Sequence, residues 1–205
     1  MKKKSKLKKI LIILIILVII AIIGILVYNF FFKNKEEEVK VIKSIPEYGY
    51  DLRENETKLY KDEFEKLDDI LSKNDVDYEE YAKEIAKLFI IDFYTLSNKQ
   101  SKNDIGGTDF IKESMRDNFI EEARSTFYRY IEVLSDNRNQ DLPEVSEIKS
   151  VKIEDTSFTY SDDTVDDNAY RVTISWDYKE DFGYETEANM IIVKEDKKLY
   201  IVEMD

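Results

Sequence analysis

The chain has 205 residues and a formal net charge of −13, with 31 Lys and Arg residues against 44 Asp and Glu residues. It contains no cysteine, which excludes disulfides and zinc–thiolate sites, and no histidine, the most common general base and metal ligand. The acidic charge makes nucleic acid and anionic lipid headgroups poor partners. We therefore expect no nucleic-acid partner, no cofactor and no bound metal.

Residues 10–32 are twenty-three consecutive residues without a charged side chain. As a helix this segment is about 34 Å long, enough to cross a hydrocarbon core of about 30 Å. Six lysines lie in residues 1–9, and lysine-rich ends stay in the cytoplasm. The sequence thus predicts a basic cytoplasmic tail over 1–9, a single transmembrane helix over 10–32, and an extracytoplasmic domain at the cell membrane.

A cleaved signal peptide is the alternative for this segment. Signal peptides share the basic start, but their apolar region is usually about 7–15 residues long and ends at a small-x-small site. The run here is longer, and the sequence that follows Gly24 offers no such site. An uncleaved signal anchor is the interpretation we adopt.

Residues 33–56 are expected to form a linker. Glycine and proline are rare in this chain, with 5 and 2 residues, yet Pro46 and Gly49 fall close together here. The remaining residues, 57–205, have the right length for one domain with its own core.

The first half of that domain has helical spacing of its apolar residues. Tyr60, Phe64, Leu67 and Leu71 form one stripe, which predicts a first helix. Asp77 resembles the N-cap of a second helix that runs to Leu96. The chain breaks at residues 104–107. A third, long helix is expected to follow, with the stripe Ile111, Met115, Phe119, Ala123, Phe127, Tyr130 and Leu134.

After Pro143 the apolar period changes to two. In residues 170–179 every even-numbered residue is apolar and every odd-numbered one is polar, which predicts a strand with one buried face. Further strands are expected near 145–160, 184–194 and 198–203. The predicted fold class is α+β, with three helices packed on a curved four-stranded antiparallel sheet.

This order of elements resembles the nuclear-transport-factor-like cone fold, which includes ketosteroid isomerases and cystatin-like domains. Together with a short basic tail and one membrane helix, it also resembles the bitopic assembly subunits of type IV secretion and conjugation systems. The resemblance covers the layout of residues 1–205 and involves no diagnostic motif. It differs in the tail, since secretion subunits of that kind often have a longer cytoplasmic one. It implies a domain that associates with envelope proteins or with itself.

Asp92 is the most unusual polar residue of the domain, because its neighbours in residues 88–96 are nearly all apolar. A carboxyl group in such surroundings can have a raised pKa and act as a general base, as the aspartate of ketosteroid isomerase does. Tyr94, Tyr128 or Tyr160 would supply a hydroxyl group. A structural role, either in solvent or hydrogen-bonded to a neighbour, is the alternative that we favour.

The acidic loop at residues 161–168 is another candidate site. Calcium requires six to eight oxygen ligands, and EF-hand loops have a glycine at the sharp turn that this loop lacks. A solvated hairpin turn is therefore the interpretation we adopt.

The aromatic residues allow two interpretations. They either fill the core between helices and sheet or line a pocket for a ligand, and both need the same residue types. The candidate ligand-binding residues are Asp92, Phe127, Tyr128, Tyr160, Trp176 and Tyr178.

Two functions follow from the sequence. The first is a membrane-anchored, extracytoplasmic interaction or scaffold module, without enzymatic activity, in an envelope or secretion complex. The second is a membrane-tethered receptor that binds a small apolar ligand in a cone-shaped pocket. An enzyme ranks third, since no pairing of a nucleophile with a base is present.

Overall fold

The computed structural model describes residues 17–25, 39–135 and 138–205. The chain divides into two compact units, Met1–Glu37 and Glu38–Asp205. In the first unit, residues 17–25 are helical. Within the described residues, no helix has both the length and the apolar character needed to cross a membrane. The rest of the segment predicted to do so, residues 10–16 and 26–32, lies outside the described residues.

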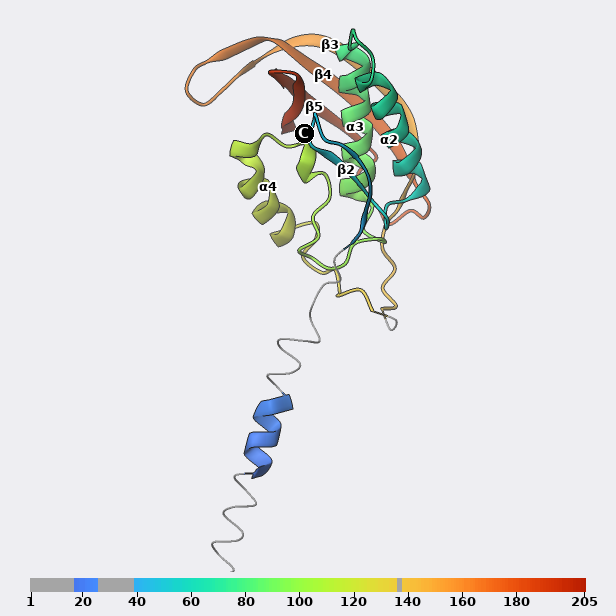
Figure 1. Cartoon of the computed structure of the whole chain (residues 1–205), viewed down its shortest axis with the longest axis vertical. Coiled ribbons are helices and arrows are strands. Elements are labelled where there is room, and N and C mark those ends of the chain that lie inside the picture. Colours follow the sequence, from blue (N-terminus) through green and yellow to red (C-terminus); the bar gives the residue numbers. More distant parts are fainter. Residues whose placement is uncertain (1–16, 26–38, 136–137) are drawn as a thin grey trace, which may run out of the picture. The chain divides into compact units, whose positions relative to one another are not determined.

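The second unit is an α+β domain (Figure 1). Its helices are α2 (Lys58–Leu71), α3 (Tyr78–Tyr94), the short 3-10 helix η1 (Thr108–Phe110) and α4 (Glu113–Ser125). The strands β1 (Val41–Ile45) and β2 (Tyr50–Arg53) form a hairpin. The strands β3 (Val145–Thr159), β4 (Val165–Tyr178), β5 (Glu187–Glu195) and β6 (Lys198–Met204) form an antiparallel sheet in that order. The predicted α+β class and antiparallel meander are confirmed.

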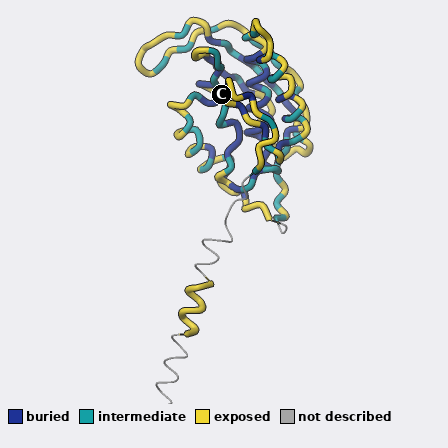
Figure 2. Tube along the Cα trace, in the orientation of Figure 1, coloured by how far each residue is buried: buried dark blue, intermediate teal, exposed yellow. Residues whose placement is uncertain are grey.

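The predicted alternation is visible in β4. Val172, Ile174 and Trp176 are buried, whereas Asp177 is exposed. The helix α3 packs on β3, β4 and β6. Among the helices of the domain, it has the most buried residues (Figure 2). The core therefore lies between α3 and one face of the sheet.

The first two predicted helices are also confirmed as α2 and α3, although α3 ends at Tyr94 and not at Leu96. The stripe of four apolar residues in α2 is buried. The Asp77 carboxylate accepts hydrogen bonds from the backbone N–H groups of Glu79 and Glu80, at 3.1 Å each. These bonds satisfy two of the N–H groups that a helix start leaves free.

The third helix is shorter than predicted. It ends at Ser125, and Thr126 leaves the helical conformation with φ −115° and ψ −95°. The chain then turns so that Tyr128 is fully buried, and its hydroxyl group donates to the Phe93 carbonyl oxygen at 2.6 Å. Leu134, at the end of the predicted stripe, is 41 % exposed. The tertiary contact of one side chain thus ends a helix that the local spacing would continue.

Much of the predicted linker is part of the domain. Residues 41–53 form the β1–β2 hairpin, and Tyr50 and Leu52 are buried. The Tyr50 hydroxyl group lies 2.7 Å from that of Tyr81 on α3. Pro46 and Gly49, which suggested a linker, lie in the hairpin turn, where Gly49 has a φ of 69° that glycine tolerates best. Residues 33–38 of the predicted linker lie outside the described residues.

Two buried glutamates meet between α2 and α3. Glu63 and Glu84 are 7 % and 3 % exposed, and Lys87 lies 3.2 Å and 2.8 Å from their carboxylates. Burial and the neighbouring Glu63 raise the pKa of Glu84 to about 8, despite Lys87. These surroundings therefore favour the protonated form of Glu84 in the folded domain.

This raised pKa predicts that stability decreases as pH rises. Between the ordinary value of 4.5 and about 8, the folded state binds more protons than the unfolded state, so the free energy of unfolding falls. Glu84→Gln should make this decrease in stability smaller by about 1–2 kcal/mol. Part of the decrease should remain in that variant, because the pKa of Glu56 is also raised, to about 7. Urea unfolding of residues 38–205 at pH 5 and pH 9 measures this, with the exposed Glu80→Gln as control. An equal fall in both variants would contradict it.

Candidate functional site

Asp92 lies inside the domain and is held by two partners. The Lys99 ammonium group donates to one carboxylate oxygen, and the Gly107 backbone N–H donates to the other at 2.6 Å. Asp92 is 5 % exposed and Lys99 is 1 % exposed. The two residues form a buried ion pair between α3 and the loop that follows it.

The surroundings of Asp92 keep it ionised. Burial by itself would raise its pKa, but the positive charges of Lys99 and Arg53 lower the pKa below its ordinary value. In the same way, burial opposes the charge of Lys99, but Asp92 and Glu56 raise its pKa. This direction is opposite to the raised pKa that a general base near neutral pH requires. The direction thus contradicts the general-base interpretation of Asp92, and the geometry fits the favoured interpretation, a hydrogen-bonded structural role.

Further charged groups surround this pair. Arg53 of β2 lies 3.0 Å from the Asp104 carboxylate, which also accepts from the Gln100 N–H at 2.9 Å. Burial and the charge of Asp92 raise the pKa of Glu56 to about 7. The ion pairs of this cluster therefore connect β2 and α3 to the loop at 96–107.

Two glycines let the loop approach α3. A Cβ atom on Gly106 would lie 2.3 Å from the Asp92 carbonyl oxygen. Gly107 has a φ of 75°, and a Cβ atom there would lie 2.6 Å from the Phe89 ring. The Gly106 N–H also donates to the Tyr128 hydroxyl oxygen at 3.1 Å. Any larger residue at these positions would push the loop away from Asp92.

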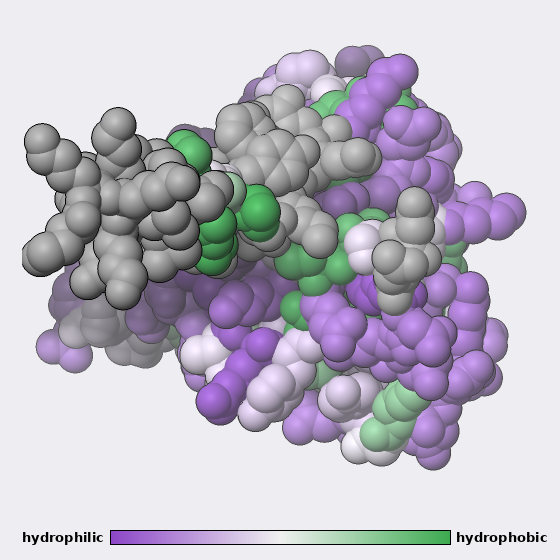
Figure 3. Space-filling model, turned by 90° about the horizontal axis from the view of Figure 1, so that it is seen from below, coloured by the Kyte–Doolittle hydropathy of each residue, from purple (hydrophilic) through white to green (hydrophobic). Residues whose placement is uncertain are grey.

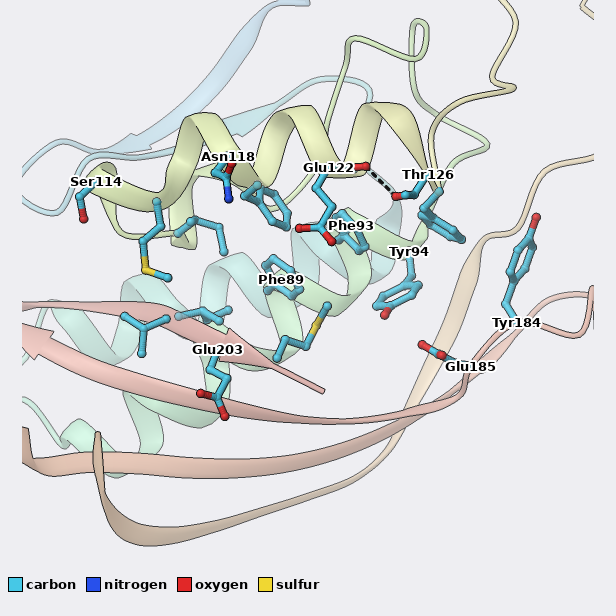
Figure 4. A pocket seen from close by; sticks show the side chains of 18 of the residues that line it. Phe89, Phe93, Tyr94, Ser114, Asn118, Glu122, Thr126, Tyr184, Glu185 and Glu203 are labelled. Atoms are coloured by element: carbon cyan, nitrogen blue, oxygen red, sulfur yellow. Dashed lines mark hydrogen bonds between the residues drawn. The ribbon is translucent and has the colours of Figure 1, made fainter. Parts of the chain in front are cut away.

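A pocket of about 820 Å³ lies elsewhere in the domain, open to solvent as a groove. It is bounded by α4, the C-terminal half of α3, β6 and the loop at 183–185 (Figure 4). We call it the α4 groove. Its aromatic lining residues are Phe89, Phe93, Tyr94, Phe119, Phe127 and Tyr184.

The aromatic lining is one connected cluster. The Phe93 ring centre lies 5.4 Å from those of both Phe89 and Phe119, and 5.6 Å from that of Phe127. Phe127 in turn meets Tyr184 edge to face at 5.2 Å. These are the separations at which aromatic pairs attract one another. The groove therefore has an aromatic wall that extends from α3 to the β4–β5 loop.

The helix α4 explains why a groove remains. Ala123 is its one buried residue, whereas α3 has buried residues along its whole length. Ser114, Asn118 and Glu122 follow each other at intervals of four and line the groove. A polar stripe of this kind cannot be packed into an apolar core. On the face seen in Figure 3, the described residues are mostly hydrophilic, apart from small apolar areas.

The candidate ligand-binding residues of the sequence analysis separate in the structure. Phe127 lines the groove. Trp176 lies behind the groove, 4.8 Å from the Tyr94 ring centre, and Tyr178 lies 6.3 Å from that of Tyr184. Tyr128 is buried behind Phe93, where it bonds to backbone groups.

Asp92 and Tyr160 are likewise absent from the groove lining. Tyr160 follows the end of β3, and the Lys112 ammonium group lies 4.7 Å from its ring centre. The acidic loop at 161–168 forms a turn with an internal hydrogen bond, in which the Asp162 carboxylate accepts from the Thr164 N–H at 3.0 Å. Sequence reasoning missed Phe89, Phe93, Phe119 and Tyr184 as site residues, and it considered Tyr94 only as a hydroxyl donor beside Asp92. The spacing of four between Phe89 and Phe93 was a signal for the first two, whereas Tyr184 lies in a loop without periodicity.

The structural role of Asp92 predicts a large loss of stability on substitution. Asp92→Asn should lower the free energy of unfolding by about 3–4 kcal/mol, because Lys99 stays buried without the carboxylate to which it donates. Asp92→Asn combined with Lys99→Met should restore part of that loss. The exposed pair Lys58–Asp62 provides the control, where Asp62→Asn should cost less than about 0.5 kcal/mol. Urea unfolding of residues 38–205 measures all three, and equal losses for the two single variants would contradict the assignment.

Comparisons with known proteins leave function to be argued from this geometry. A scan against protein-family models and searches of curated proteins and of solved structures found no match to this chain. The resemblance to nuclear-transport-factor-like domains thus continues to rest on the order of the elements alone. Two features of the domain can be used to argue its function, namely the buried charge cluster around Asp92 and the open, aromatic α4 groove.

Proposed function

We propose that the domain binds a small, largely apolar ligand in the α4 groove. The observation that carries this proposal is an aromatic-lined space of about 820 Å³ that opens to solvent. Ligand sites in proteins typically have volumes of about 300–1,000 Å³ and walls dominated by apolar and aromatic side chains. A domain core would close such a space, since interiors pack densely.

The groove chemistry supports binding rather than catalysis. Its polar side chains are hydroxyl, amide and carboxylate groups, such as those of Ser114, Asn118 and Glu122. Among the described residues, the buried carboxylates of Asp92, Glu63 and Glu84 lie in ion pairs outside the groove lining. The proposal is therefore a receptor or carrier, not an enzyme.

We further propose that the uncharged segment at 10–32 tethers this domain to the cell membrane, with residues 1–9 in the cytoplasm. The support is the length of the segment and the six lysines that precede it. Protease added to intact cells should then digest residues 38–205, and full protection of the C-terminus would contradict this topology.

An interaction module is the second candidate, and one feature favours it. The β3–β4 pairing continues to Thr159 and Val165, whereas β5 pairs with β4 only as far as Tyr170. The end of this hairpin therefore extends beyond β5 (Figure 1), and Val165 at its tip is 52 % exposed. Such an arm would suit association with envelope proteins or a second copy. Crosslinking of the full-length chain in its membrane that gave only monomer would count against it.

Filling the groove should abolish ligand binding without unfolding the domain. Asn118→Trp places a bulky ring at the groove wall, so the affinity for the neutral dye N-phenyl-1-naphthylamine should fall at least about tenfold. Dye fluorescence on titration of residues 38–205 measures this. The control is Asp117→Trp, which alters the preceding residue of α4, a residue outside the lining. The same affinity in both variants would show that the dye binds elsewhere.

A further inference from the structure

The charged side chains that line the α4 groove are of one sign. They are Glu122, Glu185 and Glu203, and none of the described residues of the lining is a lysine or an arginine. This inference rests on the proposed function, namely that the groove binds a ligand. We propose that the ligand is a small amphipathic organic cation. Its apolar body would lie along the aromatic wall, and its ammonium group would lie near the carboxylates.

Two of the three carboxylates point into the groove. Glu122 extends from α4 toward Phe93, and Glu185 extends from the β4–β5 loop toward Tyr94 (Figure 4). The Glu203 side chain points away from α4. Glu122 and Glu185 therefore face one space from opposite elements, with the Tyr94 ring between them.

These two carboxylates lack a cation of their own. Among the described residues, neither Glu122 nor Glu185 takes part in an ion pair, whereas the adjacent Glu121 pairs with Arg124 and Glu144 pairs with Lys179. Two unpaired negative charges on opposite sides of the groove, next to its aromatic wall, favour a bound positive charge. The groove thus complements a cation electrostatically.

The aromatic wall favours the same ligand class. The faces of aromatic rings carry negative partial charge and attract ammonium groups within about 6 Å. Tyr94 and Phe127 meet at 5.3 Å and lie next to the Glu185 loop, so rings and carboxylates occur at the same end of the groove. An anionic ligand would find no positive side chain in this lining. The volume of about 820 Å³ suits a small molecule rather than a folded partner.

Three probes that share one apolar body test the charge directly. They are 4-phenylbutylamine, 4-phenylbutanol and 4-phenylbutyrate, which carry a positive, a neutral and a negative head at pH 7. The full-length chain is reconstituted in phosphatidylcholine vesicles and titrated with each probe. Trp176, the single tryptophan, reports binding through its fluorescence, because it packs against Tyr94 of the groove.

The amine should bind saturably, roughly tenfold tighter than the alcohol, and the carboxylate should bind weakest. Raising the salt concentration from 0.05 to 0.5 M should weaken amine binding and leave alcohol binding unchanged. Glu122→Gln combined with Glu185→Gln should lower the amine affinity to that of the alcohol. Glu121→Gln, which alters a carboxylate of α4 outside the lining, is the matched control and should change neither affinity.

The possible outcomes separate this inference from the proposed function. Equal affinities for the amine and the alcohol would overturn the cation preference and leave an apolar ligand site in place. A preference for the amine that survives the double substitution would also overturn the assignment to these two carboxylates. No saturable change with any of the three probes would overturn both proposals.

Discussion

The buried ion pair between Asp92 and Lys99 is the interaction on which the arrangement of the domain depends. Two charges removed from water are tolerated only where they meet each other and further hydrogen bonds. Gly107 supplies one such bond to Asp92. The Lys99 carbonyl oxygen accepts from Arg138 at 2.7 Å, which connects the pair to the segment that leads into β3. The loop at 96–107 is thereby fixed against α3 although it has little secondary structure.

This fixed loop in turn sets the position of α4. The start of the helix is held because Arg116 donates to the Thr108 carbonyl oxygen at 3.1 Å and Ile111 pairs with Ile201 of β6. Its end is held because Tyr128 bonds to Gly106 and Phe93. In the middle of α4, Phe119 packs against Phe89 and Phe93, whereas the polar stripe of Ser114, Asn118 and Glu122 faces the groove. The α4 groove is therefore a consequence of a helix that is anchored at both ends.

The sequence predicted those elements whose signals are local. The stripe of α2, the Asp77 cap of α3 and the alternation in β4 each depend on neighbours along the chain, and each is confirmed. The end of α4 could not be predicted in this way, because it depends on a hydrogen bond between Tyr128 and Phe93, far apart in sequence. Lys99, the partner of Asp92, is only seven residues away in the sequence, but their contact depends on how the loop at 96–107 folds back on α3, which local periodicity does not show. Of the candidate pocket residues, only Phe127 lines the groove, since core and pocket use the same aromatic residues.

The central claim is that the α4 groove is where the domain meets its ligand. Its most direct test follows the backbone amide chemical shifts of isotopically labelled residues 38–205 during titration with 4-phenylbutylamine. The account predicts that the shifts that change cluster on α4, the C-terminal half of α3, β6 and residues 183–185. Changes that cluster instead around the β3–β4 arm or the Asp92 cluster, or no saturable change, would contradict it.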